Sequence, residues 1–312
     1  MTVARCFVTR RLPGPALERL AAEHEVDVWP EPVPPPAELL RERVGRAAGL
    51  LALLTDRVDS ALLDAAPELR VVANYAVGVD NIDLEAARAR GVSVGATPGV
   101  LTEATADLTF ALLLAAARRL PEAEARVRAG GWVTWDPGWP LGAELHGATL
   151  AIVGLGRIGR AVARRAEGFG LRVFHTSRSD PGSIALGDLL EQADFVSLHA
   201  PLTPETRGLI DAAALRRMKP TAYLVNTARG PLVDQPALIE ALREGRLAGA
   251  ALDVTDPEPP QPGDPILDAP NLVLVPHIGS ATTATRTRMA DMAVDNLLAG
   301  LAGEPLPHPA HG

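Results

Sequence analysis

The sequence predicts an α/β protein with two lobes, each built on a parallel β-sheet. The chain has 312 residues, which at about 150 residues per domain indicates two domains. Short apolar runs alternate with amphipathic stretches almost from end to end, as they do in βαβ units. One glycine-rich turn, from Gly154 to Gly159, lies between an apolar run and a helical stretch.

The first third of the chain is expected to form one sheet with helices on its faces. Its apolar runs have the length of strands, and the stretches between them repeat apolar residues at helical spacing. Pro15 suits an early helical position, and Gly91 follows a helical stretch as a terminating glycine does. The expected strands are residues 5–8, 26–29, 49–54, 71–75 and 92–95, and the expected helices are residues 15–22, 36–44, 60–66 and 83–89.

The middle of the chain is expected to be one long helix followed by an irregular stretch. The helical pattern covers residues 101–120, and Pro121 ends or kinks it. Residues 130–147 are irregular and hold Trp132, Trp135 and Trp139, three of the chain's four tryptophans. This cluster is either a local hydrophobic plug or an arm that packs on another subunit.

A second alternating series fills the rest of the chain. Only this series contains a glycine-rich turn of the phosphate-binding kind. Its expected strands are residues 150–153, 172–175, 195–198, 222–226, 248–252 and 272–275. Its expected helices are residues 158–169, 186–192, 212–218 and 236–243, with a last long helix over residues 280–299.

Composition excludes several classes of function. The formal net charge is -8 and basic residues form no long run, so a nucleic-acid partner is not expected. The longest apolar stretch, residues 110–117, is far below the ~20 residues that span a bilayer, and the first residues lack a signal peptide. Cys6 is the single cysteine, and the sequence has no HxxxH or CxxC pair. We therefore expect a soluble, cytoplasmic protein with no metal site and no membrane partner.

The motif Gly154-Leu155-Gly156-Arg157-Ile158-Gly159 predicts a dinucleotide site. It follows an expected strand and opens an expected helix, which is the context that gives such a motif meaning. Gly154 permits the tight turn, Gly156 lets the backbone approach a pyrophosphate, and Gly159 lets helix and strand pack closely. Free amides at the start of the helix would then face the anion.

The end of the second strand in this series favours NADP(H) over NAD(H). Enzymes that prefer NAD usually place a carboxylate there, about 20 residues after the glycine motif, to hold the ribose 2′-hydroxyl. Here the stretch reads His175-Thr176-Ser177-Arg178-Ser179, and the first carboxylate is Asp180. Arginine and serine hydroxyls bind a 2′-phosphate, whereas a carboxylate repels it. The alternative interpretation is that Arg178 is a solvated surface charge.

Three polar side chains follow strands of the second series, where sites form in α/β proteins. Arg229 follows the strand at 222–226, Glu258 follows the strand at 248–252, and His277 follows the strand at 272–275. The reduction of a ketone needs such a set: a cation for a substrate carboxylate, an acid for the carbonyl oxygen, and an anion that keeps this acid protonated. By position alone, His277 is either a general acid or an ordinary structural histidine.

These residues lie in motifs that resemble those of the D-isomer-specific 2-hydroxyacid dehydrogenases, over nearly the whole chain. Within that family the sequence looks most like the glyoxylate/hydroxypyruvate reductases. The motifs are Val77-Gly78-Val79-Asp80-Asn81, the glycine turn, Asn226-Thr227-Ala228-Arg229-Gly230, Leu252-Asp253-Val254 with Glu258-Pro259, and Pro276-His277-Ile278-Gly279-Ser280.

The resemblance implies a role for each matching residue. Arg229 would bind the substrate carboxylate, His277 would protonate the carbonyl oxygen, and Glu258 would keep His277 protonated. Val77 and Gly78 would offer backbone amides to the substrate, Leu53 would line its pocket, and Trp139 would reach into the neighbouring subunit's site. The cofactor-binding residues would be Thr105, Gly154, Leu155, Gly156, Arg157, Ile158, Ser177, Arg178, Ser179, Thr227, Ala228, Asp253, His277 and Gly279.

The resemblance also implies an architecture and an activity. A substrate lobe, residues 1–97 with 285–312, would receive a cofactor lobe, residues 98–284, and both lobes would be Rossmann-like or flavodoxin-like. The expected enzyme is a homodimer that reduces small 2-oxo acids with NADP(H), with NAD(H) as the alternative cofactor. Two other interpretations stay open: an NAD(H)-sensing corepressor of the same fold, and an NAD-dependent phosphoglycerate or formate dehydrogenase.

Overall fold

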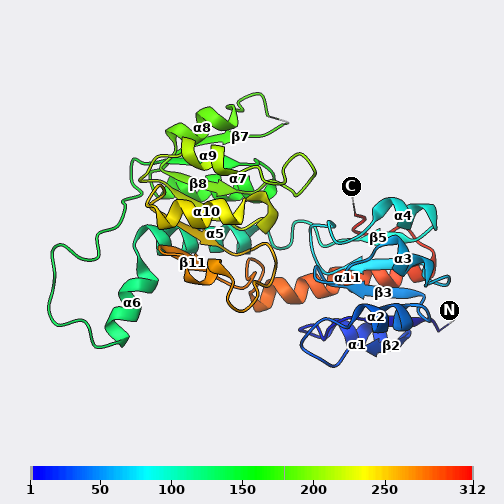
Figure 1. Ribbon diagram of the computed structural model, residues 1–312. Coiled ribbons are helices and arrows are strands. Elements are labelled where there is room, and N and C mark those ends of the chain that lie inside the picture. The colour runs from blue at the N-terminus through cyan, green and yellow to red at the C-terminus, as the bar shows by residue number, and fades with distance from the viewer. Residues whose placement is uncertain (1–2, 179, 311–312) are drawn as a thin grey trace. The chain divides into compact units, whose positions relative to one another are not determined.

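The computed structural model describes residues 3–178 and 180–310. The chain divides into two compact units, Met1–Leu101 with Ala281–Gly312, and Thr102–Ser280 (Figure 1). The second unit is therefore inserted into the first along the chain. The cofactor lobe expected from the sequence, residues 98–284, is about four residues longer at each end than the second unit of the structure. The difference arises because residues 98–101 and 281–284 pack with the first unit.

The first unit contains a five-stranded parallel sheet with the strand order β2-β1-β3-β4-β5. In its centre, Cys6 of β1 is in register with Val26 of β2 on one side and Gly49 of β3 on the other. This order is that of flavodoxin-like folds. The chain first adds β2 on one side of β1 and then adds β3, β4 and β5 on the other side, so the switch point of the sheet lies between β1 and β3. The strands are β1 (Arg5–Val8), β2 (Glu25–Val28), β3 (Gly49–Ala52), β4 (Val71–Asn74) and β5 (Ser93–Gly95).

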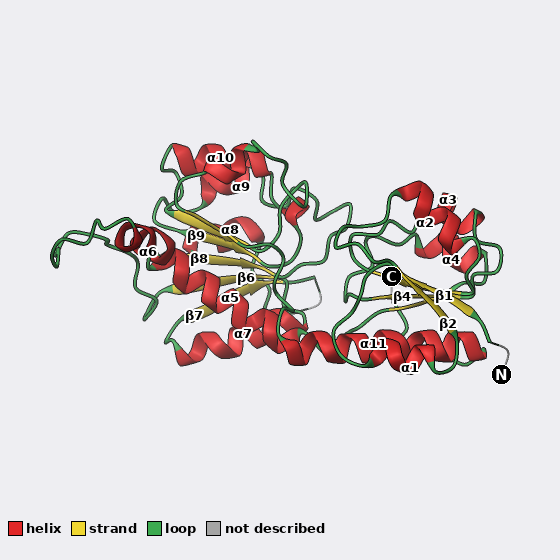
Figure 2. Cartoon of the chain, turned by 90° about the horizontal axis from the view of Figure 1, so that it is seen from below, coloured by secondary structure: helices red, strands yellow, loops and turns green. Residues whose placement is uncertain are grey.

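Helices cover both faces of this sheet (Figure 2). On one face, α1 (Ala16–Ala21) and α11 (Thr283–Ala302) pack through apolar residues such as Leu20 and Leu297. On the other face lie α2 (Ala37–Val44), α3 (Ser60–Asp64) and α4 (Leu84–Ala89). The two buried faces explain why the inner strands β3 and β4 are nearly continuous apolar runs in the sequence, whereas the edge strand β2 alternates.

The second unit contains a six-stranded parallel sheet with the strand order β11-β10-β9-β8-β6-β7. The switch point of this sheet, where the order of added strands changes side, lies between β6 and β8. The strands are β6 (Thr149–Val153), β7 (Arg172–Thr176), β8 (Phe195–Leu198), β9 (Tyr223–Asn226), β10 (Gly249–Leu252) and β11 (Leu272–Leu274). Every strand that the sequence predicted is present, with its ends shifted by at most two residues, so the predicted fold class is confirmed.

Two layers of helices cover the second sheet (Figure 2). The layer on one face consists of α5 (Thr102–Ala117) and α7 (Arg157–Gly168). The opposite layer consists of α8 (Leu186–Gln192), α9 (Ala212–Arg217) and α10 (Gln235–Arg243), and short 3₁₀ turns lie at Gly230–Leu232 and Pro265–Asp268. Phe195 of β8 and Leu150 of β6 are among the fully buried side chains between these layers.

The middle of the chain differs from the expectation. The long helix α5 ends at Ala117, and a separate helix, α6 (Leu120–Arg128), follows it. Arg119 between them has φ of 54°, a left-handed conformation that interrupts the helix. Pro121 therefore begins a helix instead of ending one, because a first-turn position needs no backbone N–H donor. Residues 130–147 contain no helix or strand, and we call them the arm.

Candidate active site

The glycine turn lies at the switch point of the second sheet, between the carboxyl ends of β6 and β8. Gly154 has φ of 97°, and a Cβ there would meet the backbone of His199 and Ala200 at 2.7 Å, so only glycine fits. At Gly156, which precedes α7, a Cβ would meet nothing within 4 Å. No side chain caps the first turn of α7, and Gly156 at its start is exposed. This arrangement fits the pyrophosphate of a dinucleotide.

The end of β7 lies beside this turn and holds the residues expected to select the cofactor. Arg178 is exposed, and the backbone N–H of Ser177 donates to Ser183 Oγ at 2.9 Å. Asp180 already has partners: its Oδ1 accepts from the Gly182 N–H at 3.0 Å, and its Oδ2 lies 3.5 Å from Arg160.

These contacts determine the charge of the Asp180 carboxylate. The Gly182 N–H, followed by His175 and Arg160, lowers the pKa of Asp180, although partial burial acts against them. Asp180 is thus an ionised carboxylate that is held by its own neighbours. Ser179, which the sequence also placed here, lies outside the described residues.

The side chains of His277 and Glu258 are in contact in the loops that follow β10 and β11. His277 Nδ1 lies 2.5 Å from Glu258 Oε1, and the two side chains are 25% and 30% exposed. Within residues 3–178 and 180–310, no hydrogen bond engages His277 Nε2, so this nitrogen can face a ligand. A histidine whose Nδ1 is held by a carboxylate, with Nε2 presented outward, is an arrangement suited to proton transfer.

Asp253, at the end of β10, fixes the backbone around His277. Its Oδ1 accepts from the Ile278 N–H at 2.6 Å and its Oδ2 from the Gly279 N–H at 2.8 Å, while its own carbonyl accepts from the His277 N–H. His277 has φ of 51°, and these bonds hold that unusual conformation. Burial raises the pKa of Asp253, and the Ile278 amide opposes this effect. The sequence pointed to a cofactor contact for Asp253 and missed this role in holding the His277 turn.

The loop that carries Arg229 folds around the buried side chain of Asn226. The Asn226 side chain donates from Nδ2 to the Arg229 carbonyl at 2.8 Å and accepts the Ala228 N–H at 3.0 Å. Arg229 is half-buried and donates from Nη1 to the Ala228 carbonyl. Because β9, β10 and β11 are neighbours, the loops with Arg229, Asp253 and His277 leave the sheet side by side.

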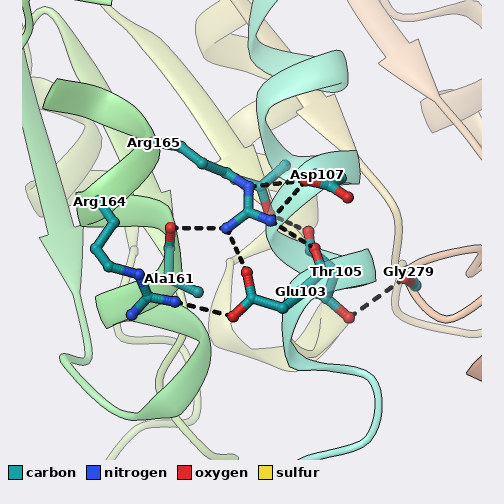
Figure 3. Close-up of polar contacts among 8 residues, drawn as sticks. Glu103, Thr105, Asp107, Ala161, Arg164, Arg165 and Gly279 are labelled. Carbon is teal, nitrogen blue, oxygen red and sulfur yellow. Dashed lines mark hydrogen bonds and ion pairs between the residues drawn. The ribbon is translucent and has the colours of Figure 1, made fainter. Parts of the chain in front are cut away.

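Helix α5 ties two of these loops together through buried threonines. Thr105 Oγ1 donates to the Gly279 carbonyl at 3.3 Å (Figure 3). One turn further, Thr109 Oγ1 donates to the Thr105 carbonyl at 2.8 Å and lies 3.0 Å from Thr227 Oγ1. A hydroxyl has one hydrogen, so Thr227 is the donor in the last pair. Thr227 therefore offers only lone pairs to a ligand, and the sequence did not identify Thr109.

Ion pairs fasten the start of α5 to α7, the helix of the glycine turn. Arg165 lies between Glu103 and Asp107, with its nitrogens 2.8 and 2.6 Å from their carboxylates (Figure 3). Arg164 adds a contact of 2.8 Å to Glu103. Helix α5, whose Thr105 binds the Gly279 carbonyl, is thus joined to α7, which follows the glycine turn.

The remaining predicted residues lie in other parts of the chain. Leu53 follows β3 of the first unit, and Val77 and Gly78 follow β4. Trp139 lies in the arm, where the guanidinium carbon of Arg126 sits 4.1 Å from the centre of its ring. Among the described residues, no group of three or more His, Cys, Asp or Glu side chains could hold a metal ion. No helix in that part of the chain is long and apolar enough to cross a membrane.

Comparison with known proteins gives the site its context. Residues 110–279 match the family model of the D-isomer specific 2-hydroxyacid dehydrogenase, NAD binding domain. A glyoxylate reductase of Korarchaeum cryptofilum is 52% identical over 96% of this chain and 93% of its own length. A glyoxylate reductase of Aeropyrum pernix is 50% identical over 97% of this chain and 95% of its own length. The chain belongs to the D-isomer-specific 2-hydroxyacid dehydrogenase family.

Solved structures of the family agree with the fold described above. A protein of Thermus thermophilus superimposes with a TM-score of 0.93, at 54% identity, over 98% of this chain and 100% of the other. An NADPH-dependent glyoxylate/hydroxypyruvate reductase of Sinorhizobium meliloti, in complex with NADP and malonate, gives a TM-score of 0.86 at 35% identity, over 99% and 97%. This D-2-hydroxyacid dehydrogenase is thus an NAD(P)-dependent oxidoreductase that acts on 2-hydroxy acids.

Proposed function

We propose that this dehydrogenase prefers NADPH and reduces small 2-oxo acids, converting glyoxylate to glycolate and hydroxypyruvate to D-glycerate. The observation that carries the proposal is the contact between His277 and Glu258 beside the loop of Arg229. The names of the similar proteins, which are glyoxylate reductases, support this substrate class.

In this proposal the second unit binds the dinucleotide and supplies the acid. The glycine turn and the start of α7 hold the pyrophosphate, and the reduced nicotinamide, when bound, supplies the hydride that reaches C2 of the substrate. His277 donates its Nε2 proton to the carbonyl oxygen as negative charge develops there. Glu258 accepts a hydrogen bond from the Nδ1–H, which fixes the tautomer and the orientation of the His277 ring. Arg229 orients the substrate by pairing with its carboxylate.

Three residues of the first unit bind the substrate in this proposal. The backbone amides of Val77 and Gly78 bind the substrate carboxylate, and Leu53 lines the pocket beside the small side chain of the substrate. Both loops follow the carboxyl ends of strands, where α/β sheets bind their ligands. Thr105, Thr227, Ala228 and Asp253 would contact the nicotinamide side of the cofactor, with Thr227 acting only as an acceptor.

The preference for NADPH rests on the charges at the end of β7. Arg178 is exposed there, and the Asp180 carboxylate is held by Gly182, His175 and Arg160. A 2′-phosphate would thus meet an arginine and a serine hydroxyl rather than an unengaged carboxylate. The relative from Sinorhizobium meliloti that binds NADP supports the same preference.

We also propose that the enzyme is a homodimer whose arm packs on the partner. Exposed large apolar side chains concentrate on α6 and the arm, which a solvated surface does not require. These side chains are Leu120, Val127, Trp132, Val133, Trp135 and Leu141. Trp139, on the same arm, would then reach the neighbouring subunit's substrate site.

A panel of substrates tests the proposed function. Glyoxylate, hydroxypyruvate and pyruvate are each assayed with NADPH and with NADH by the loss of absorbance of the reduced nicotinamide. We expect the highest kcat/KM with NADPH and either glyoxylate or hydroxypyruvate. A roughly tenfold preference for NADH, about 1.4 kcal/mol, would contradict the cofactor assignment. Absence of turnover with all three acids would contradict the activity and would favour a regulatory protein of the same fold.

A further inference from the structure

A buried carboxyl group, that of Asp56, lies at the switch point of the first sheet, between β1 and β3. Thr9 follows β1 and Asp56 lies in the loop after β3, and both side chains are buried. Thr9 Oγ1 donates to Asp56 Oδ2, and the Leu53 N–H donates to the same oxygen at 2.7 Å. In open α/β sheets, this crevice is the usual place for a ligand. In this chain the Asp56 side chain joins the two adjoining loops at that point.

Two asparagines extend these contacts to the loop after β4. Asn81 Nδ2 lies within hydrogen-bond distance of the carbonyls of Leu53 and Asp56, at 3.0 Å each. Asn74 Nδ2 donates to the Gly78 carbonyl at 2.8 Å and to Asn81 Oδ1 at 3.1 Å. The loops after β1, β3 and β4 are therefore joined by side chains that leave little freedom to the backbone of Leu53 and Gly78.

Val77 and Gly78, whose amides bind the substrate in the proposed function, have no side chain that fixes the position of their own backbone. Gly78 has no side chain, and the Val77 side chain is 38% exposed. Asn74 holds the Gly78 carbonyl and Asn81 holds the Leu53 and Asp56 carbonyls, so these bonds restrain the backbone on the C-terminal side of the two amides and the adjoining loop. Preorganised amides bind an anion more strongly because the protein does not have to reorganise when the ligand arrives.

We propose that Asp56, Asn74 and Asn81 are positioning residues for the substrate, and that they hold the backbone of Leu53 and Gly78 in the arrangement that binds the carboxylate of a small 2-oxo acid. This inference rests on the proposed function, in which Val77 and Gly78 contact that carboxylate. The three residues do not touch the reacting atoms.

The cost of burying Asp56 agrees with a positioning role. Burial raises the pKa of Asp56, whereas the bonds from Thr9 and Leu53 lower it. Its Oδ1 is buried and has no hydrogen-bond partner among the described residues. Burying a polar atom without a partner costs free energy. The carboxyl group therefore carries this cost at Oδ1, while its Oδ2 holds the loops of Thr9 and Leu53.

The main test is Asn81→Ala, because Asn81 is only half-buried and the variant is expected to fold. Four constants are measured in the full-length enzyme: kcat, the KM for glyoxylate, the KM for NADPH, and the Ki of oxalate in competition with glyoxylate. We expect the KM for glyoxylate and the Ki of oxalate to rise by about tenfold, with kcat changed less than about threefold, as for a loss of uniform substrate binding. The KM for NADPH should stay within about twofold, since the cofactor residues belong to the second unit.

Asn296→Ala is the matched control. Asn296 is another buried asparagine of the first unit, and it donates to the Ala96 carbonyl at 3.0 Å and accepts the His308 N–H at 2.9 Å. Its loss should lower the melting temperature and leave the KM for glyoxylate unchanged. The inference is overturned if Asn81→Ala leaves both the KM for glyoxylate and the Ki of oxalate unchanged. It is also overturned if both variants change all the constants alike.

A second pair of variants tests Asp56. Asp56→Asn keeps an oxygen that can accept the Leu53 N–H, so it should stay within about threefold of the wild-type KM for glyoxylate. Asp56→Ala removes the acceptor and should raise this KM more than Asp56→Asn does; equal effects of the two would overturn the role of Asp56. If the wild type reduces none of the 2-oxo acids, the proposed function fails. If the wild type is active but these variants behave like Asn296→Ala, only the positioning role fails.

Discussion

Glu258 Oε1 lies 2.5 Å from His277 Nδ1, although the two residues leave the sheet from different strands. Glu258 belongs to the loop after β10 and His277 to the loop after β11, and these strands are neighbours. A carboxylate that holds Nδ1 fixes the orientation of the imidazole ring. The pairing of neighbouring strands therefore sets the orientation of the His277 side chain.

Glu258→Gln should lower kcat for glyoxylate by about tenfold or more, because a neutral amide replaces the anion that holds His277 Nδ1. The KM for NADPH should stay nearly unchanged, since Glu258 lies outside the glycine turn. Steady-state rates of both proteins at one pH measure the change. A kcat equal to that of the wild type would show that Glu258 does not act on His277.

His277→Ala should lower kcat for glyoxylate by at least about 10²-fold, the lower range for a positioned acid. Binding of NADPH should persist, because the glycine turn at the start of α7 does not depend on this side chain. Steady-state rates and a fluorescence titration with NADPH measure the two quantities. A kcat near that of the wild type would remove His277 from the mechanism.

Arg178→Ala should raise the KM for NADPH by about tenfold and leave the KM for NADH nearly unchanged, since only NADPH carries the 2′-phosphate. Arg46→Ala is the matched control, because Arg46 is an exposed arginine of the first unit that lies 3.5 Å from the Glu42 carboxylate. A parallel loss for both cofactors would indicate a general change of surface charge. In that case Arg178 would not be the residue that recognises the phosphate.

The sheets and the places of His277 and Glu258 after neighbouring strands could be predicted from the sequence, because both leave local marks. Strands buried on two faces are apolar runs, and His277 lies three residues after β11, the last strand of the second sheet. Contacts between buried polar side chains leave no such mark. Thr109 and Thr227 are 118 residues apart in the chain, and Thr9 and Asp56 are 47 apart, so nothing near either residue announces its partner.

Helix α6 was missed for a related reason. None of its residues is buried, so no apolar stripe at helical spacing identifies it. Its start depends on the left-handed conformation of Arg119 and on an ion pair between Arg119 and Glu122 at 2.7 Å. The sequence pattern instead suggested that Pro121 ends the preceding helix, since proline is disfavoured in helix interiors.

The buried carboxyl group of Asp56 should make stability depend on pH in a predictable direction. Desolvation raises the pKa of Asp56 above its unfolded value, so folding favours the protonated form. The wild type should therefore lose stability as the pH rises from the unfolded pKa through the folded one, by up to about 1.4 kcal/mol per pH unit in that window. Asp56→Asn does not titrate, so its stability relative to the wild type should grow over the same window. Urea unfolding of both proteins from about pH 4 to 7 measures the gap, and a constant gap would contradict the raised pKa.

The exposed tryptophans of the arm should control the oligomeric state. Trp132 and Trp135 are 71% and 78% exposed, a cost that contact with a second copy of the chain would remove. The wild type should be a dimer by light scattering at micromolar concentration, and replacing both tryptophans with serine should shift it to monomers. Leu267→Ser is the matched control, since Leu267 is an exposed apolar residue of the same unit outside the arm. A monomeric wild type, or a double variant that stays dimeric, would show that the arm does not pack on a partner.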